Sequence, residues 1–285
     1  MNMTQTNLES KNTVPGSIAQ VGTIMKYTLL DYLRSRRFFI MLIITVLISL
    51  LLTVLVGYYR PEGFLSSNLT FYSNWWGSSV TFVVILSAIF FGGDAISGEF
   101  QNKTGYFGVP NPIRRSSIYV GKWLAAFTAS LVMLGIFTIV TVANGLYYFS
   151  GVPYQFGESL IFALIYMVAV LGFTFFFSSL FKSSSMSILL TAILFLFVFS
   201  LIQTLVSSLV KIEPWFILTY GSTIIGNVLT VPYPAHMTTA SFGPNARVQL
   251  TTYNATIPEG LAIMLIYFAV TVILGLLLFE RKEFN

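Results

Sequence analysis

Six stretches of the chain are long, apolar and free of charged side chains. Each has roughly the 20 residues that an α-helix needs to cross a hydrocarbon core about 30 Å thick. A charge near the middle of such a helix costs about 2.5 to 3.5 kcal/mol, whereas each Leu, Ile or Phe returns only about 0.3 to 0.6 kcal/mol. The absence of Asp, Glu, Lys, Arg and His therefore predicts six membrane-spanning helices, at residues 38–57, 76–93, 123–149, 159–181, 186–210 and 260–279.

The residues before the first span predict a separate helix. Residues 1–16 are mostly polar, and we expect a disordered tail there. From residue 17 to residue 37, apolar side chains recur at helical spacing while Lys26, Arg34 and Arg37 fall on the opposite side. This pattern predicts an amphipathic helix over 17–37 that lies along the inner leaflet. The alternative is a cytosolic stub whose basic end only fixes the topology.

The segment at 211–259, between the fifth and sixth spans, is the longest of the outer loops. Its first part, 214–231, is apolar but broken by glycines, which predicts a re-entrant hairpin. Its second part is rich in proline and contains an alternating run at 248–253, which predicts an ordered outer cap with little helix. We expect His236, within this cap, to be a solvated loop residue and not a ligand. Asn68 and Asn254 lie in outer glycosylation sequons.

The distribution of cations predicts the orientation of the spans. With the N-terminus inside, all but three of the 15 Lys and Arg residues fall on the cytoplasmic side. Both termini are then cytoplasmic, and the chain is a multi-pass protein of the cell membrane. Aromatic residues mark the predicted outer boundary of the first two spans: Tyr58, Tyr59, Phe71, Tyr72, Trp75 and Trp76.

Composition excludes several classes of protein. Apolar residues make up 55% of the 285 and charged residues only 9%, with a mean hydropathy of +0.80, whereas a soluble domain has about 25% charged residues. Without cysteine the chain has no disulfide or thiolate metal site, and the single His236 argues against a histidine-based metal site or a catalytic dyad. The cations are scattered at span ends, so we expect no nucleic-acid partner.

The chain also lacks an energy source of its own. It has no phosphate-binding loop, because Gly121-Lys122 has neither the upstream glycine nor the following hydroxyl residue. The spans contain none of the carboxylates that proton-coupled carriers use as relays. Transport would thus be driven by a partner or would be passive.

The polar connector between the second and third spans is the main candidate for a docking surface. Asp94 follows two glycines and can cap a short helix that carries Ile96, Glu99 and Phe100. Asn111-Pro112 is a second helix-start signal before the third span. A short amphipathic helix beside a basic one suits a groove on a partner protein, although any connector between two spans also needs polar residues and caps.

The connector resembles that of the membrane-spanning subunits of type-2 ABC exporters, and residues 99–104 are similar to the bacteriocin and drug-export subgroup. These subunits have six spans and a series of acid, glutamate, threonine, proline, arginine and lysine before the third span. The residues that carry the resemblance are Asp94, Glu99, Thr104, Pro110 or Pro112, Arg114 and Lys122. The family often has glycine directly before the threonine, where this chain has Lys103.

The resemblance implies a permease without enzymatic activity or cofactor of its own, coupled to two copies of a cytosolic ATPase that bind ATP and Mg. It implies a second permease chain, identical or related, and contact with membrane lipids. The fold would be all-α, with six spans, an N-terminal interfacial helix and a short cytoplasmic coupling helix. The residues expected to couple the chain to the ATPase are Asp94, Ile96, Glu99, Phe100, Thr104, Arg114 and Lys122.

The candidates for a cargo path are polar residues deep in the spans: Thr141, Asn144, Gln203 and Thr204. Such side chains more often bond between helices than bind a cargo. A path lined mainly by Phe, Leu and Ile suits an amphipathic or apolar cargo such as a lipid, a peptide or a drug. Two other functions stay open from the residues alone: a secondary carrier or channel, and a non-transporting anchor that recruits a cytosolic partner.

Overall fold

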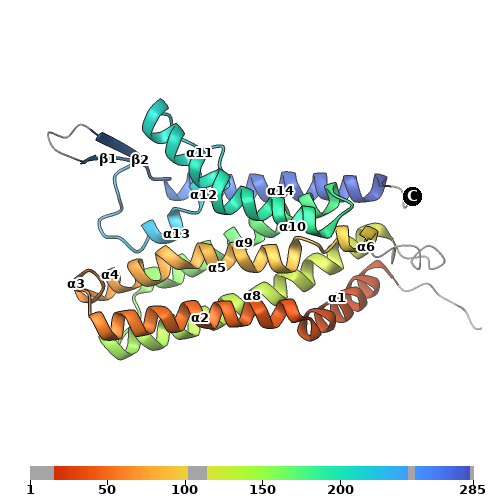
Figure 1. Ribbon diagram of the computed structural model, residues 1–285, viewed down its shortest axis with the longest axis horizontal. Coiled ribbons are helices and arrows are strands. Elements are labelled where there is room, and N and C mark those ends of the chain that lie inside the picture. The colour runs from red at the N-terminus through yellow and green to blue at the C-terminus, as the bar shows by residue number, and fades with distance from the viewer. Residues whose placement is uncertain (1–15, 102–113, 243–247, 283–285) are drawn as a thin grey trace, which may run out of the picture.

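The computed structural model describes residues 16–101, 114–242 and 248–282. In this part of the chain, six helical segments are long and apolar enough to span a membrane, and they lie side by side in one elongated bundle (Figure 1). The predicted all-α membrane fold with six spans is confirmed. The spans are α2 (Arg36–Tyr59), Asn68–Gln101, α8 (Arg115–Phe149), α9 (Tyr154–Leu180), Ser184–Val210 and α14 (Ile257–Arg281).

Two of the spans are built from several helical pieces. The second consists of α4 (Asn68–Tyr72), the π-helical η1 (Ser73–Gly77) and α5 (Ser78–Gly92), with the short α6 (Ser97–Gln101) after it. The fifth consists of α10 (Ser184–Ile193), η2 (Leu194–Val198), α11 (Phe199–Leu205) and η3 (Val206–Val210). Apolar periodicity does not distinguish these π-helical turns from regular helix, so the sequence prediction did not include them.

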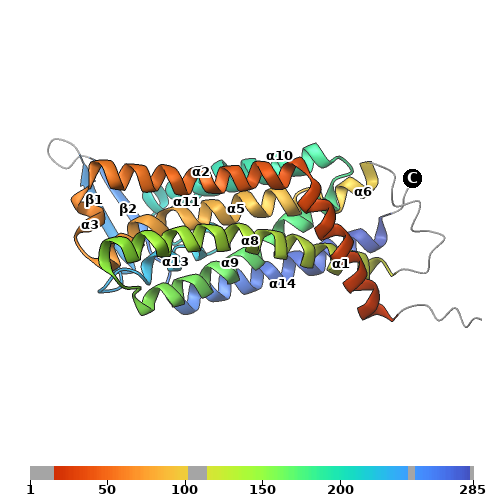
Figure 2. The same ribbon diagram turned by 90° about the horizontal axis from the view of Figure 1, so that it is seen from below.

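The N-terminal helix is shorter than predicted. It is α1 (Ser17–Arg34), and it ends because Ser35 is extended. The hydroxyl of Ser35 accepts a hydrogen bond from the Phe38 N–H at 3.3 Å and so caps α2. Arg36 and Arg37 consequently belong to the first span and not to the amphipathic helix. Figure 2 shows α1 crossing the bundle at an angle to α2.

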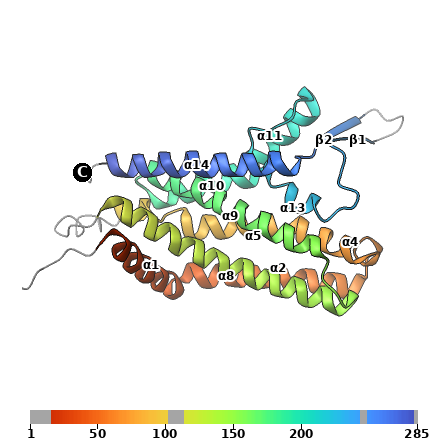
Figure 3. The same ribbon diagram turned by 180° about the vertical axis from the view of Figure 1, so that it is seen from behind.

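The core lies around α5 and α9, which run through the middle of the bundle (Figure 3). About two-thirds of the most apolar window of the second span is buried, and 61% of that of α9. The corresponding fraction is only 22% for α2 and 17% for the fifth span. These outer helices therefore present apolar faces to lipid or to a second chain.

Four of the aromatic residues expected at the membrane boundary are in fact buried. Tyr58 and Tyr59 are exposed as predicted, but Phe71, Tyr72, Trp75 and Trp76 have no exposed surface. The indole N–H of Trp76 donates to the Ser159 hydroxyl at 2.9 Å, and its ring stacks on Phe137. The cause is that the second span begins at Asn68, so these rings face α8 and α9.

The two ends of the bundle differ. At one, which we call the α6 end, lie α1, α6 and the C-terminal turns of α14 (Figure 1). At the other, the hairpin end, lie α3 (Glu62–Leu65), α4 and an antiparallel hairpin of β1 (Met237–Phe242) and β2 (Val248–Tyr253), with Met237 opposite Tyr253.

The apolar segment predicted as a re-entrant hairpin contains two short helices. These are α12 (Leu218–Gly221) and α13 (Ile224–Asn227). Ile224 and Ile225 are buried, and a side chain added at Gly77 would lie 3.0 Å from the Gly226 Cα. The segment thus packs closely against the start of the second span.

Candidate functional site

The short helix α6 is attached at its N-terminus to α9. The N–H groups of Ile96 and Ser97 donate to the Ser178 hydroxyl oxygen, at 2.9 and 3.0 Å. All three residues are buried. One side chain of α9 therefore satisfies two of the backbone donors that a helix N-terminus leaves unpaired.

The middle of α6 is attached to α8 by a partly buried ion pair. Lys122 pairs with Glu99 and also donates to the Ala95 carbonyl at 2.8 Å. The Lys122 and Glu99 side chains are only 15% and 24% exposed. A charge pair so poorly hydrated is weakly screened by salt, and its hydrogen bonds are of the strong, charge-assisted kind.

The end of α6 is attached to α10 and α14. The side-chain carbonyl of Gln101 accepts the Ser184 N–H at 2.7 Å, at the start of α10. The ring of Phe100 packs edge-on against Phe279 of α14, with ring centres 6.2 Å apart. The Lys282 ammonium lies 4.3 Å from the centre of the Phe100 ring.

Lys282 also links the end of α14 to the end of α9. Its ammonium donates to the carbonyls of Ser179 and Phe181, at 3.0 and 2.9 Å. Burial, and then the charge of Lys182, lower the pKa of Lys282 to about 8. The carbonyls at the C-terminal, negative end of α9 favour the charged ammonium and therefore oppose this lowering of the Lys282 pKa.

The end of the second span and the connector also contact α1 and α2. The Tyr32 hydroxyl of α1 donates to the Phe91 carbonyl at 2.6 Å, and Arg37 of α2 forms an ion pair with Asp94. Burial, reinforced by the charge of Asp94, raises the pKa of Tyr32, so its hydroxyl remains a donor. A Cβ atom added at Gly121 would lie only 2.8 Å from the Ile24 side chain, so α1 and α8 approach each other closely at this glycine.

The predicted coupling residues mostly lie at the α6 end. Asp94, Glu99, Phe100 and Lys122 make the contacts described above, and the Arg114 N–H donates to the Gln20 side chain at 3.4 Å, which joins the start of α8 to α1. Ile96, which was expected to contact the ATPase, has no exposed surface. Thr104, Pro110, Asn111 and Pro112 lie outside the described residues.

The contacts of Ser178, Gln101 and Lys282 were not predicted from the sequence. Ser178 is one of many serines near span ends, and Lys282 belongs to a short charged tail in which two glutamates flank two cations. Nothing in the local pattern distinguishes either residue. Their roles depend on which helices pack together, which is decided by the fold.

A cavity of about 550 Å³ lies between the second span, α9 and the fifth span. Aromatic rings and polar groups share its lining, which includes Phe82, Tyr166, Phe195, Ser200, Gln203 and Thr219. The side-chain carbonyl of Gln203 accepts a hydrogen bond from Thr219 at 3.0 Å. A mixed lining of this kind can hold an amphipathic molecule.

Of the four residues predicted for a cargo path, Gln203 lines this cavity. Asn144 instead donates to the Thr53 hydroxyl at 3.1 Å, which joins α8 to α2. The hydroxyls of Thr141 and Thr204 donate to carbonyls one turn earlier in their own helices. Asn144 therefore has the helix-bonding role that such residues most often have.

Comparison with protein families gives one match that covers most of the chain. The model of the ABC-2 family transporter proteins matches residues 23–284. No curated protein matches the chain. Proteins of this family are the transmembrane component of an ABC transporter and associate with an ABC ATPase in the membrane. With its six apolar helices and a match over nearly its whole length, the chain belongs to the ABC-2 family of transporter permeases.

Proposed function

We propose that this chain is the permease subunit of an ATP-driven exporter in which α6 receives the motion of a separate ATPase. The observation that carries the proposal is the attachment of α6 to four spans. The helix and the turn before it bond to Lys122 of α8, to Ser178 of α9 and to Ser184 of α10. Phe100 packs on α14.

Through these contacts, a movement of α6 would be transmitted to the spans of the bundle. A neutral hydrogen bond contributes about 0.5 to 1.5 kcal/mol and one to a charged group about 1.5 to 3 kcal/mol. Several such bonds act together on one short helix, so a push on α6 displaces the attached spans with it. Gln101 is exposed, and Glu99 and Phe100 are partly exposed, which gives a partner access to the helix.

In this proposal the α6 end faces the cytoplasm, and both termini lie there. The cations support this orientation by the positive-inside rule. Nine of them lie in α1, at the start of α2, at the start of α8 or at the end of α14: Lys26, Arg34, Arg36, Arg37, Arg114, Arg115, Lys122, Arg281 and Lys282. Two ATPase copies would hold ATP and Mg, and a second permease chain would complete the transporter in the cell membrane.

We assign the cargo to the amphipathic or hydrophobic class, which includes lipids, peptides and drugs. The cavity beside the fifth span supports this, because it combines Phe82 and Phe195 with the polar groups of Gln203 and Thr219. A small hydrated ion would need charged or closely spaced carbonyl ligands instead. Coupling through α6 would open and close this cavity.

Reconstitution tests the proposal. The chain is purified with its ATPase, placed in liposomes, and assayed with a fluorescent lipid and with an amphipathic dye. We expect ATP-dependent movement of at least one probe, which is lost with an ATPase that cannot hydrolyse ATP. Movement by the chain alone without nucleotide would identify a secondary carrier or channel. ATPase binding without movement of any probe would identify an anchor, and either result would overturn the proposal.

A further inference from the structure

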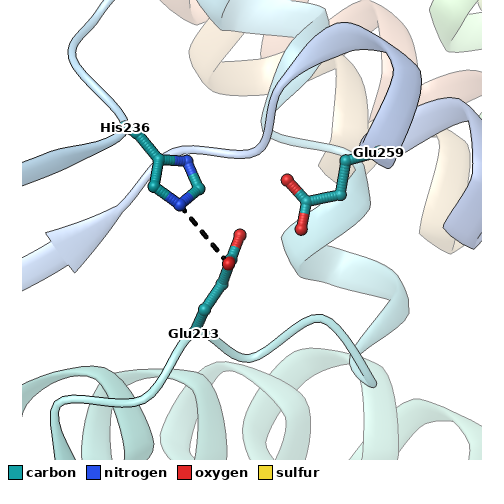
Figure 4. Close-up of side chains that lie close together, drawn as sticks. All are labelled: Glu213, His236 and Glu259. Atoms are coloured by element: carbon teal, nitrogen blue, oxygen red, sulfur yellow. Dashed lines mark ion pairs between the residues drawn. The ribbon is translucent and has the colours of Figure 1, made fainter.

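Three side chains that can ligate a metal converge at the hairpin end. Glu213 follows the fifth span, His236 precedes β1, and Glu259 lies in the first turn of α14 (Figure 4). The His236 Nε2 lies 3.3 Å from the Glu213 Oε2. One ligand atom from each residue lies within 4.8 Å of the other two.

Each of the three side chains is held in place by a group outside the cluster. The His236 Nδ1 lies 3.0 Å from the Asn254 carbonyl oxygen, to which it can only donate, so in the neutral imidazole the Nε2 lone pair faces the carboxylates. The Tyr220 hydroxyl donates to the Glu213 Oε1, which leaves Oε2 available. The Glu259 Oε2 accepts the Thr256 N–H at 3.2 Å, and this carboxyl group also lies within hydrogen-bonding reach of Glu213. Outer partners of this kind orient the ligands of protein metal sites.

The cluster has an excess of negative charge. In the described part of the chain, no lysine or arginine nitrogen lies within 4.0 Å of either carboxylate, and His236 is the ion-pair partner of Glu213. With the imidazole neutral, two carboxylates face each other across a few ångströms. Such an arrangement favours a cation between them.

We propose that Glu213, His236 and Glu259 bind a divalent transition-metal ion, with zinc as the best match. One imidazole nitrogen and two carboxylate oxygens are ligands that zinc accepts, with bonds of about 2.0 to 2.2 Å. Two ligands at such distances on a tetrahedral ion are about 3.3 Å apart, which is the observed separation of His236 Nε2 and Glu213 Oε2. Water would complete the coordination, and the exposed side of His236 provides access.

The ion would connect three segments that are separate in the sequence. It would tie the end of the fifth span, the hairpin and the start of the sixth span to one point. His236 is the exposed loop residue that the sequence predicted, and the proposal adds a ligand role to it. The site lies at the opposite end of the bundle from α6, and the proposal does not depend on the ATPase (Figure 1).

Zinc titration of the purified chain alone tests the proposal. The chain is stripped with a chelator, freed of any histidine tag, and titrated with zinc by calorimetry, and with cobalt by absorption spectroscopy. We expect one ion per chain, a rise in unfolding temperature on binding, and a cobalt spectrum typical of nitrogen and oxygen ligands at low coordination number. Absence of saturable binding by the wild-type chain would overturn the proposal.

Variants locate the site. His236→Gln and Glu213→Gln should each weaken zinc binding more than about 100-fold, and Tyr220→Phe, which removes only an outer partner, about 10-fold or more. Glu62→Gln, an exposed glutamate in α3 away from the cluster, is the matched control and should bind like wild type. Unfolding temperatures in chelator show whether each variant folds. Equal binding by wild type and His236→Gln would place the ion elsewhere and refute the assignment.

Discussion

Replacing Lys122 with Met should separate ATP hydrolysis from transport. Methionine keeps most of the length and the apolar stem of lysine, but it removes the ammonium that holds Glu99 and the Ala95 carbonyl. The loss would therefore fall on the attachment of α6 to α8, and the packing of α8 itself would change little.

The magnitude follows from the burial of the pair. Removing one partner of a fully buried ion pair costs about 3 to 5 kcal/mol, while an exposed pair is worth at most about 1 kcal/mol. Lys122 and Glu99 are only 15% and 24% exposed, so we expect a cost of about 3 kcal/mol, at the lower limit for a fully buried pair. This corresponds to about a 150-fold loss in the equilibrium population of α6 that is seated on α8.

The assay is the ratio of transported probe to hydrolysed ATP in liposomes. We expect Lys122→Met to lower this ratio at least about 10-fold, and Glu99→Gln, which keeps an acceptor oxygen, to lower it less. The double variant Glu99→Lys with Lys122→Glu should recover part of the loss shown by Lys122→Glu alone. Lys211→Met, an exposed lysine at the hairpin end, is the control. A wild-type ratio of transported probe to hydrolysed ATP in Lys122→Met would refute transmission of movement through α6.

Three further predictions concern packing and the cavity. Gly121→Val should detach α1 and destabilise the chain by about 1 to 3 kcal/mol in thermal unfolding, whereas Gly135→Val on the same helix, with open space around it, should not; equal effects would contradict the close contact. Asn144→Leu should cost about 0.6 kcal/mol of stability and leave the transport ratio unchanged, and a selective loss of transport would return it to the cargo path. Gln203→Leu should change dye transport severalfold at unchanged unfolding temperature, and unaltered transport would exclude the cavity.

The spans were predictable because the cost of a charge in lipid dominates every other term. Six charge-free windows therefore sufficed to give the number and approximate position of the spans. Their ends were less predictable, since they depend on caps worth about 1 kcal/mol, such as that of Ser35 on α2. The same cap places Arg34 in α1 and Arg36 in α2, whereas the periodic pattern alone assigned both residues to one helix.

Burial within the bundle was not predictable for the aromatic residues. In lipid, Trp76 gains no hydrophobic free energy by leaving the surface, so composition does not say whether it faces a headgroup or a neighbouring helix. Its bond to Ser159 decides this, and that bond requires α9 to lie beside the second span.

The candidate sites show the same division. The contact of Glu99 with Lys122 joins residues that the family resemblance had already selected. The convergence of Glu213, His236 and Glu259 requires the hairpin and the start of α14 to meet. No spacing in the sequence indicates such a meeting, because it depends on how α12, α13 and the hairpin fold between these residues.

The orientation and partner of α6 can be tested with two single-cysteine variants, because the chain has no cysteine of its own. Gln101→Cys places a thiol at an exposed position of α6, and Thr252→Cys places one in β2 at the hairpin end. In intact cells, we expect the thiol at position 101 to cross-link to the ATPase chain and to resist a membrane-impermeant maleimide, which should label position 252. Labelling of position 101 from outside, without a cross-link to the ATPase, would contradict the account.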